Sequence, residues 1–588
     1  MIQIRDNKRF TVLYLFFVLA VTFTVFSESV TFDFTNWDDE THLTLNPVVR
    51  NLTWINVKRI FSSTLQGTYI PLSTLSFTIE HHFFGLQPFV YHFNNIILHL
   101  LTTAGIYFFA LRLGAPVGAA AIAAFIFGIH PIHVESVVWI TERKDVLYAA
   151  FYMAAVLLYL GYQNCHRRFL LYLSVSAGIF SMLAKPMALS LPLILLICDW
   201  FLGRRINRQV LIEKIPYFIF IIPLTWITYS EQMRFPAASA GQSLLIWIWT
   251  FTFYINKFFM PAKLIPIYPL PLPVTIWNPV YAGAVLLLIV LIGIFWKYRH
   301  NRWLMLAGLF YAGSIFFLMR FDANRDTHIV ADRFMYLPSV GICLFLGVCA
   351  QRIWTGIRNK PLSRQALAAV LFLAPALGLP WLTMQQSRIW RNSFSLWRHV
   401  IQKNPQEEIA YHNLAIEYSR HFHYNEAIQL YEKALAIDPL YAETYNNLGN
   451  LYYNRGNRVR AFRCFEQAIR IYPDYAEAYG NRGNLFAQYG YISNALHDMN
   501  MAVVLKPNHP GPYFERGNLF TKIRKYDLAV MDYTRAIELD PQYAAAYNNR
   551  GVAYYRMKMR DLAQTDFLTA ARLNPNDTSA FFNQGLVK

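Results

Sequence analysis

The pattern of hydrophobic and polar positions divides the chain into two regions. Apolar runs long enough to cross a bilayer recur up to about residue 384. They lie near residues 11–28, 93–111, 116–130, 147–163, 169–184, 187–202, 215–230, 243–260, 280–296, 303–320, 336–354 and 365–384. This pattern predicts a helical, multi-span membrane domain over residues 1–384.

Basic residues predict the orientation of these helices. They gather in the short loops at residues 167–168, 204–208, 297–302 and 352–360, which the positive-inside rule assigns to the cytoplasm. Three apolar runs lie between the second and third loops, whereas two loops on the same side of a membrane must be joined by an even number of crossings. One segment within 215–260 is therefore expected to be re-entrant, interfacial or a pair of half-helices. The first run lacks a small-residue cleavage site and is expected to be a retained helix. About eleven crossings then place the C-terminal region on the non-cytoplasmic side.

A 34-residue period replaces this pattern from about residue 405. Proline, alanine, glycine and aromatic residues each keep that period, with proline at positions 405, 439, 473, 507, 541 and 575. Thirty-four residues with small, aromatic and terminal proline positions are typical of the tetratricopeptide (TPR) repeat. The sequence predicts an all-α fold with a TPR domain over 408–588, made of five repeats and a partial terminal helix. Residues 385–407 are predicted to be an amphipathic connector.

Composition supports a membrane protein and excludes some other classes. The chain is 55% hydrophobic and only 15% charged, whereas soluble domains carry roughly 25% charged residues. Its formal charge of +18 is explained by the cytoplasmic loops, so no nucleic-acid partner is expected. The five cysteines form no CxxC pair, which indicates neither a disulfide framework nor a zinc site.

Ionisable residues gather in the loops predicted to be non-cytoplasmic. The cluster Trp37-Asp38-Asp39-Glu40 follows the first run, and Arg320, Arg325 and Arg333 break the positive-inside trend. An anionic ligand such as a lipid phosphate would explain these arginines, since Arg binds phosphate bidentately. Further polar residues on the same predicted face are His42, His92, His130, His133, Glu135, Arg143, Lys144, Lys185 and Tyr336.

The triplet His130, His133 and Glu135 offers three donors to a divalent cation. Pro131 interrupts a helix between the two histidines, so hydrogen-bonding structural roles or headgroup contacts are the favoured interpretation. No metal ligand is assigned, no cofactor is certain, and a divalent cation is left open.

An asparagine row accompanies the repeats. Asn413, Asn447, Asn481, Asn549 and Asn583 share one repeat position, with Glu515 in the fourth place. A carboxamide both donates and accepts hydrogen bonds, so such a row could bind the backbone of an extended acceptor peptide. Alternatively, it could tie adjacent repeats together. The row resembles the peptide-binding asparagines of the nuclear and cytosolic O-GlcNAc transferase.

Several motifs together resemble the transmembrane-and-TPR family of protein O-mannosyltransferases and its bacterial relatives, which belong to the GT-C class. They are Trp37-Asp38-Asp39 with Asn46-Pro47, Tyr91-His92-x-Asn94, His130-Pro131-x-His133-Val134-Glu135-Ser136, Glu142-Arg143-Lys144-Asp145 and Asp332-Arg333-x-x-Tyr336-Leu337-Pro338-Ser339. The resemblance implies transfer of a sugar from a polyprenyl- or dolichyl-phosphate donor to a Ser/Thr hydroxyl of an acceptor protein.

The resemblance also implies site roles. An acidic pair in the first external loop would activate the acceptor, with Asp39 as the expected base and Asp38 next. Cations would stabilise the leaving phosphate: Arg333, Lys144, Arg143 and Lys185, with Tyr336 beside them. Glu40, His42, His92, His130, His133 and Glu135 would support the site. The shorter chain looks bacterial, which implies an inner-membrane protein with a periplasmic site, or a luminal site if it is from the endoplasmic reticulum.

Two other interpretations stay open. A membrane-anchored TPR scaffold for envelope or secretion assembly would need only one span. A transferase acting on a glycan acceptor would have no use for a peptide groove.

Overall fold

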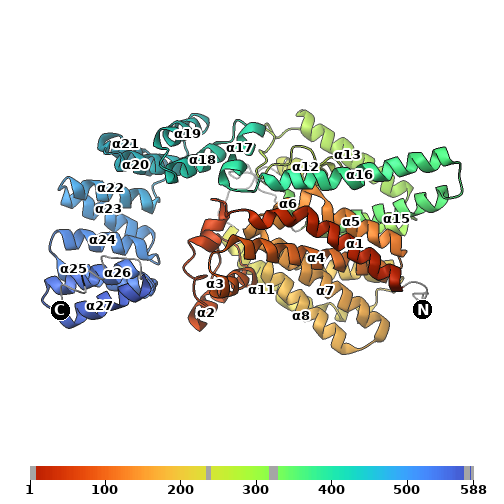
Figure 1. The fold of residues 1–588 in the computed structure, drawn as a ribbon, viewed down its shortest axis with the longest axis horizontal. Helices are drawn as coiled ribbons and strands as arrows, with labels where there is room; N and C mark the ends of the chain where they lie inside the picture. The colour runs from red at the N-terminus through yellow and green to blue at the C-terminus, as the bar shows by residue number, and fades with distance from the viewer. Residues whose placement is uncertain (1–7, 233–239, 317–328, 575–582, 584–588) are drawn as a thin grey trace. The chain divides into compact units, whose positions relative to one another are not determined.

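A computed structural model of the 588-residue chain describes residues 8–232, 240–316, 329–574 and 583. The described residues are almost entirely helical, and their one β-bridge joins Leu65 and Thr68. The all-α fold class is therefore confirmed. The chain forms two compact units, residues 1–403 and 404–588 (Figure 1).

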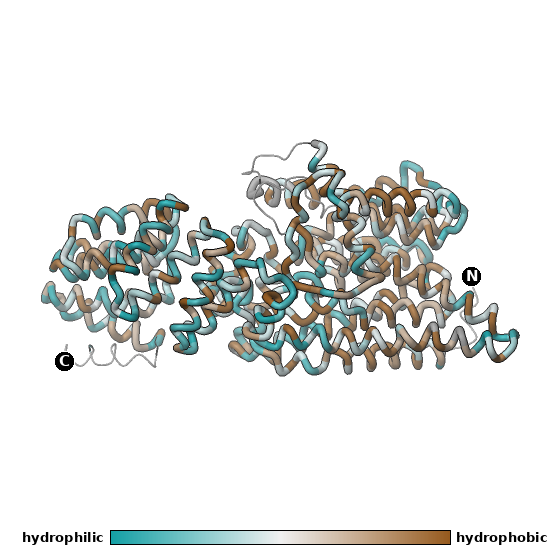
Figure 2. The backbone as a smooth tube through the Cα atoms, turned by 90° about the horizontal axis from the view of Figure 1, so that it is seen from above, coloured by the Kyte–Doolittle hydropathy of each residue, from teal (hydrophilic) through white to brown (hydrophobic). Residues whose placement is uncertain are grey.

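Long apolar helices make up the first unit, and each lies over a predicted apolar run. They are α1 (Lys8–Phe26), α4 (Pro88–Arg112), α5 (Val117–Ile129), α7 (Arg143–Cys165), α8 (Arg168–Ala184), α9 (Leu191–Phe201), α11 (Ile215–Gln232), α12 (Ala240–Phe259), α13 (Pro279–Lys297), α14 (Arg302–Ile315), α15 (Ser339–Ile357) and α16 (Leu362–Arg388). Figure 2 shows hydrophobic residues along most of their length.

Five of these helical segments are long and apolar enough to cross a membrane: Arg9–Thr31, Pro88–Arg112, Ile140–Cys165, Pro279–Lys297 and Ser339–Ile357. A sixth span is formed if Val117–Ile129 and Pro131–Val138, which meet at 52°, count as one. The eleven predicted crossings stay a prediction. Residues 233–239, within the segment expected to be re-entrant, lie outside the described residues.

Small residues let the central helices approach closely. A Cβ atom on Gly341 of α15 would lie 2.8 Å from the carbonyl oxygen of Ala307 on α14. On the same helix, a Cβ on Gly347 would collide with the backbone of α5 at Ala119. Small residues at such crossings allow the backbone contact that holds helices together in a membrane. The core of this unit is thus built on close contacts of α15 with α5 and α14.

Short elements between the long helices carry most of the predicted site. They are η1 (Ser27–Thr31), η2 (Glu40–Thr44), α2 (Trp54–Ser62), α3 (Pro71–Phe84), η3 (Pro131–His133), α6 (Val134–Val138), η4 (Ile140–Glu142), η5 (Pro186–Ser190), α10 (Arg208–Ile212), η7 (Asp332–Met335) and α17 (Ser393–Lys403). Pro131 separates α5 from η3, as its missing N–H and fixed φ require.

Five helix pairs form the described part of the second unit. They are α18 (Glu408–Arg420) with α19 (Tyr424–Ile437), α20 (Ala442–Asn454) with α21 (Arg458–Ile471), α22 (Ala476–Gln488) with α23 (Ile492–Leu505), α24 (Pro510–Lys522) with α25 (Tyr526–Leu539), and α26 (Ala544–Arg556) with α27 (Arg560–Leu573). The predicted terminal helix lies outside the described residues, except for Asn583.

The repeated glycine explains how each pair packs. A Cβ on Gly449 would lie 2.6 Å from the ring of Phe465, and a Cβ on Gly517 would lie 2.8 Å from the ring of Tyr533. Only a residue without a side chain lets the aromatic ring of the second helix lie directly on the first. The 34-residue spacing of glycine therefore records a packing requirement of each repeat.

Candidate active site

The two aspartates of the loop that follows α1 and η1, Asp38 and Asp39, lie in different surroundings. Asp39 is 1% exposed, and its carboxylate accepts hydrogen bonds from the N–H and hydroxyl of Thr35 at 2.8 and 2.9 Å and from the N–H of Thr141 at 3.2 Å. Burial raises its pKa to about 6 despite these hydrogen bonds. Asp38 is half-buried. Of the pair, Asp38 is the carboxylate that a ligand can reach.

His42 follows this pair in the chain and is buried on the π-helical turn η2, which Glu40 begins. Its Nε2 lies 3.2 Å from Oε1 of Gln66, whose amide Nε2 donates to Oγ1 of Thr41 at 3.0 Å. With the amide oxygen of Gln66 toward the imidazole, Nε2 of His42 is the nitrogen placed to donate to it, and Nδ1 has no hydrogen-bond partner among the described residues. Burial and the charge of Lys144 lower the pKa of His42 to about 4, while Asp38 opposes this shift.

Glu142 lies at the centre of a buried cluster of three cations and three carboxylates, itself included. Its carboxylate lies 3.0 Å from Nζ of Lys144, 3.5 Å from Nζ of Lys185 and 3.3 Å from Nε of Arg333. Lys185 also pairs with Asp145, and Arg333 with Glu135. The carboxylates neutralise the cations, while the side chains of Arg333 and Lys144 are 21% and 14% exposed. These two cations are accessible to an anion.

Two residues expected at the donor phosphate lie in the protein interior instead. Arg143 is 1% exposed and donates to Asn95, to Glu80 at 2.5 Å and to the carbonyl of Tyr91 at 2.8 Å. Tyr336 is fully buried, and its hydroxyl lies 2.7 Å from Nδ1 of His99. Their polar groups join helices to one another, which leaves them poorly placed to bind a headgroup.

His130, His133 and Glu135, the triplet that could have held a metal, each form hydrogen bonds with different groups. His130 contacts the carbonyl of Phe258 at 3.0 Å, and the two nitrogens of His133 contact the carbonyl of Phe127 at 2.8 Å and Ser339 at 3.0 Å. Among the described residues, no three His, Cys, Asp or Glu side chains are grouped to hold a metal ion. His92 is also buried, edge-on to Phe32. The histidines serve as hydrogen-bonded or packed interior groups.

Several buried polar atoms near Glu142 have no hydrogen-bond partner within the described part of the chain. They are Nδ1 of His42, Nε1 of Trp139, Oγ1 of Thr141 and Oη of Tyr148. Unpaired buried polar groups are costly, so each one calls for an explanation. They comprise two hydroxyls, one indole N–H and one imidazole nitrogen, all of them buried.

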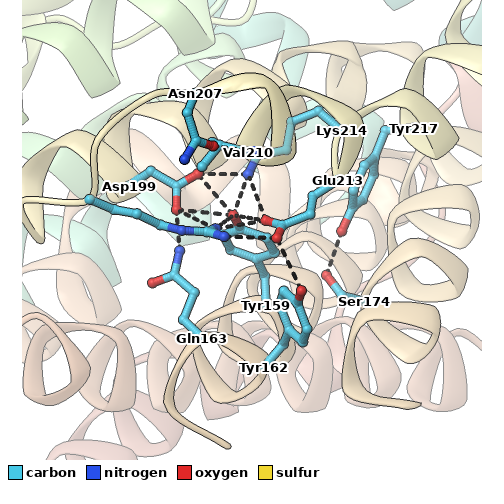
Figure 3. Close-up of polar contacts among 11 residues, drawn as sticks. Tyr159, Tyr162, Gln163, Ser174, Asp199, Asn207, Val210, Glu213, Lys214 and Tyr217 are labelled. Atoms are coloured by element: carbon cyan, nitrogen blue, oxygen red, sulfur yellow. Dashed lines mark hydrogen bonds and ion pairs between the residues drawn. The ribbon is translucent and has the colours of Figure 1, made fainter. Parts of the chain in front are cut away.

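A second charged cluster lies toward the other end of α7, about 24 Å along the helix from Arg143 at 1.5 Å per residue. Figure 3 shows Tyr159 at its centre. Its hydroxyl contacts both oxygens of Asp199 at 3.0 and 2.8 Å, Glu213 at 3.2 Å and Lys214. Arg204 binds Glu213 at 2.6 and 2.7 Å. Two carboxylates balance two cations, so this cluster is a closed structural network.

The asparagine row makes contacts between repeats. Asn481 donates to Asn446 at 2.8 Å, Asn549 to Asn518 at 2.8 Å, and Asn583 to Asn548 at 3.0 Å. The remaining members, Asn413 and Asn447, are half-buried, and Asn447 lies 3.4 Å from His412 of the preceding repeat. These contacts fit the alternative in which the row ties repeats together.

A groove nevertheless follows the same helices. A cavity of about 540 Å³ over α20, α22 and α24 is continuous with a smaller one of about 270 Å³, through shared residues that include Asn450, Asn481 and Asn484. Its wall is rich in carboxamides from three successive repeats: Asn446, Asn450, Asn454, Asn481, Asn484, Gln488 and Asn518. The carboxamide surface is thus broader than the predicted row.

Three residues around Asp39 and the cation cluster of the first unit were not predicted from the sequence. The central role of Glu142 was missed, although it lies in a motif beside Lys144. Gln66 was missed because it is distant in sequence from His42. Trp139 was missed because an indole in an apolar stretch gives no signal of its own. Arg320 and Arg325, which share the predicted loop with Arg333, lie outside the described residues.

Comparison with known families identifies the repeats. The TPR repeat model matches residues 423–456 and 517–558, and tetratricopeptide repeat models match residues 442–475 and 544–577. A crystal structure of YrrB, titled a TPR protein with an unusual peptide-binding site, is 25% identical and covers 32% of this chain and 97% of its own, with a TM-score of 0.26.

Curated relatives extend the similarity into the first unit, residues 1–403, which is the membrane unit of the chain. Protein O-mannosyl-transferase TMTC1 of Homo sapiens is 24% identical over 449 residues, which cover 66% of this chain and 50% of the relative. Protein O-mannosyl-transferase F38B6.6 of Caenorhabditis elegans is 25% identical over 413 residues, which cover 66% and 56%. The chain spans about half the length of the curated relatives it matches.

Proposed function

This chain is a homologue of the TMTC protein O-mannosyl-transferases, which carry TPR repeats, and on that premise we propose that it is a membrane glycosyltransferase acting on proteins. The donor would be a sugar linked to a polyprenyl or dolichyl phosphate, and the acceptor a Ser or Thr hydroxyl. The reaction would run on the non-cytoplasmic face of a bacterial inner membrane or, in a eukaryotic cell, of the endoplasmic reticulum.

One observation carries the proposal. Asp38, a half-buried carboxylate, lies close enough to the cluster of Lys144, Lys185 and Arg333 for the charges of Asp38 and Lys144 to act on the same imidazole. Asp38 and Lys144 both act on His42, and Lys144 shares Glu142 with Arg333. A reaction that takes a proton from a hydroxyl and releases a phosphate needs a base and a cationic site within one substrate's reach.

Asp38 is the preferred base, in place of Asp39. It would take the proton of the acceptor hydroxyl as the hydroxyl oxygen bonds to the anomeric carbon. The bond from that carbon to the phosphate oxygen breaks at the same time, and the lipid phosphate leaves with the electron pair. Asp39 would hold the loop, because its oxygens already accept three hydrogen bonds.

Arg333 and Lys144 are the preferred phosphate ligands, supported by Lys185 from behind. Their partially exposed side chains retain N–H groups, while Glu135 and Glu142 hold them in place. A site fixed before the substrate arrives stabilises the leaving charge without reorganising during the reaction.

The groove over α20, α22 and α24 is proposed to recruit the acceptor. Its carboxamides could pair with the N–H and C=O groups of an extended peptide in a way that tolerates many sequences. Such a groove would raise the local concentration of Ser and Thr side chains near the membrane site.

A membrane assay with a polyprenyl-phosphate sugar and an acceptor protein tests the reaction. Asp38→Asn should lower transfer at least about a hundredfold, in line with the usual contribution of a general base. Asp33→Asn is the matched control, because Asp33 is exposed in the same loop. Full activity of Asp38→Asn would refute the base assignment, and no sugar transfer by the wild type with any lipid-phosphate donor would refute the function.

A further inference from the structure

Four tryptophan rings from three distant segments contact one another in series at the loop that carries Asp38 and Asp39; three of the rings are stacked, and Trp397 is tilted at 52° to Trp37. Trp37 stacks on Trp139 with ring centroids 4.7 Å apart and planes at 25°, and Trp139 stacks on Trp390 at 5.2 Å and 24°. Trp397 lies 5.1 Å from the other side of Trp37. Trp139, Trp390 and Trp397 are at most 2% exposed. Offset aromatic pairs of this kind add to the free energy gained by burial alone.

Hydrogen bonds attach the same connector to the loop that carries Asp38. The indole N–H of Trp397 donates to Oδ1 of Asn36 at 2.6 Å, and the backbone N–H of Asn36 donates to Oγ of Ser393 at 2.9 Å. The backbone N–H of Asp33 donates to the carbonyl of Arg391 at 3.0 Å. Asn36 and Trp37 directly precede Asp38, so little freedom is left to its backbone.

The stack also reaches the cation cluster. The guanidinium of Arg333 lies 5.5 Å from the ring centroid of Trp139, within the range of a cation–π interaction. Two residues after Trp139, the N–H of Thr141 donates to Asp39. One side of the stack therefore contacts the acidic loop, and the other contacts a proposed phosphate ligand.

The connector helix α17 ends at Lys403, and the repeat unit begins at the next residue. The indoles of Trp390 and Trp397 thus belong to the segment that leads directly into the repeats, while they pack in the membrane unit. A segment that served only as a flexible tether would not bury two tryptophans against the loop of a candidate active site.

We propose that the connector forms a wall of the active site, with Trp397 and Trp390 as positioning residues. Trp397 holds Asn36 and thereby the backbone of Asp38, and Trp390 supports Trp139 and thereby Arg333. This inference rests on the proposed function for its catalytic consequence. The distance between the base and the phosphate ligand would then be set by residues adjoining the repeat domain.

The test uses the full chain in detergent or lipid. Trp397→Phe retains a ring but loses the N–H, and Asn36→Leu removes its acceptor. Each should lower kcat by about tenfold to a hundredfold, as small displacements of catalytic groups do, and leave KM for donor and acceptor within about twofold. The double variant should be no worse than Asn36→Leu alone, because the hydrogen bond that Trp397→Phe removes is already absent from that variant.

Trp381→Phe is the matched control, since Trp381 lies on the neighbouring helix α16 with 61% exposure. Additive losses in the double variant, a rise in KM alone, or unchanged kcat would overturn the inference. Amide hydrogen exchange over residues 33–45 gives a readout independent of turnover. Exchange should quicken in Trp397→Phe and Asn36→Leu and stay unchanged in the control. Unchanged exchange in all three variants would overturn the inference even for a chain that transfers no sugar.

Discussion

The carboxylate of Asp39 accepts a hydrogen bond from the backbone N–H of Thr141, 3.2 Å away and 102 positions later in the chain. This contact joins the loop of Asp38 and Asp39 to the start of the segment that carries Glu142 and Lys144. Asp39 therefore fixes this loop against the cation cluster, while its neighbour Asp38 is half-buried.

Asp39→Asn should lower stability more than it affects an isolated chemical step. The amide of asparagine has only one accepting oxygen, so in either orientation its NH₂ faces a group of Thr35 or Thr141 that now donates to Asp39, and the buried mismatch should cost about 1–3 kcal/mol. Thermal unfolding of Asp39→Asn in detergent, compared with Asp33→Asn, measures this. An unchanged melting temperature would contradict the structural role.

Asp39 and His42 should have opposite effects on stability between about pH 4 and pH 6.5. The pKa of Asp39 is raised to about 6, so its contribution is greatest below pH 4 and is lost as pH rises through 6. The pKa of His42 is lowered to about 4, so its contribution is greatest above pH 6.5 and is lost as pH falls through 4.

The pKa shifts of Asp39 and His42 are of similar size and correspond to about 3 kcal/mol each, at 1.36 kcal/mol per pKa unit. The two contributions to the free energy of unfolding should therefore nearly cancel in the wild type. Relative to the wild type, His42→Gln should make the unfolding free energy rise less steeply with pH across this window, whereas Asp39→Asn should make it rise more steeply. Unfolding free energies at several pH values, with Asp33→Asn as the reference, check both slopes. Parallel pH profiles of the two variants would contradict the prediction.

Arg333→Lys should impair transfer although it retains the positive charge. A lysine cannot keep the paired contacts with Glu135 and Glu142 while also donating to a phosphate, because the planar fork of N–H groups is lost. We expect transfer to fall by about ten- to a hundredfold, with a higher KM for the lipid donor. Arg352→Lys on α15, an exposed site, is the control. Equal activity of the two variants would remove Arg333 from the site.

The repeats of the second unit differ at one pair of positions, where one repeat has a salt bridge and an earlier repeat has two apolar residues. Arg516 binds Asp532 bidentately at 2.8 and 2.7 Å, and Asp532 is only 6% exposed. The equivalent positions two repeats earlier are Leu448 and Cys464. Arg516→Leu should destabilise the unit by about 3–5 kcal/mol, because it leaves a buried carboxylate unpaired.

The double variant Arg516→Leu/Asp532→Cys should recover most of that loss, since it reproduces the apolar pair of the earlier repeat. Thermal unfolding followed by circular dichroism compares the wild type, the single variant and the double variant. A double variant as unstable as the single one would show that the apolar pair depends on its own repeat.

Lys214→Met should destabilise the membrane unit without entering the proposed chemistry. Lys214 lies 2.6 Å from Asp199, which is completely buried, so its loss leaves an uncompensated charge and should cost about 3–5 kcal/mol. Asp199→Asn combined with Lys214→Met removes both charges and should be less damaging. Unfolding in detergent and specific activity of the folded fraction separate stability from turnover.

The sequence by itself determined the helical fold and the five repeats. Each repeat is defined by contacts within about 34 residues, so the period of Gly449 and its counterparts reports the packing against Phe465 directly. The apolar runs likewise identified the helices of the membrane unit, because each run reflects one helix and its surroundings. The sequence also indicated which motifs contain the polar residues of the candidate site, including Asp38, Asp39 and Arg333.

Only the tertiary structure decided what those residues contact. Arg143 and Lys144 are neighbours in sequence, yet the buried Arg143 pairs with Glu80, whereas Lys144, whose side chain is 14% exposed, pairs with the buried Glu142. Trp390 and Trp397 read as part of a connector, and their place against Trp37 and Trp139 depends on contacts spanning hundreds of residues. Burial and partner choice are properties of the packed whole, and no local pattern encodes them.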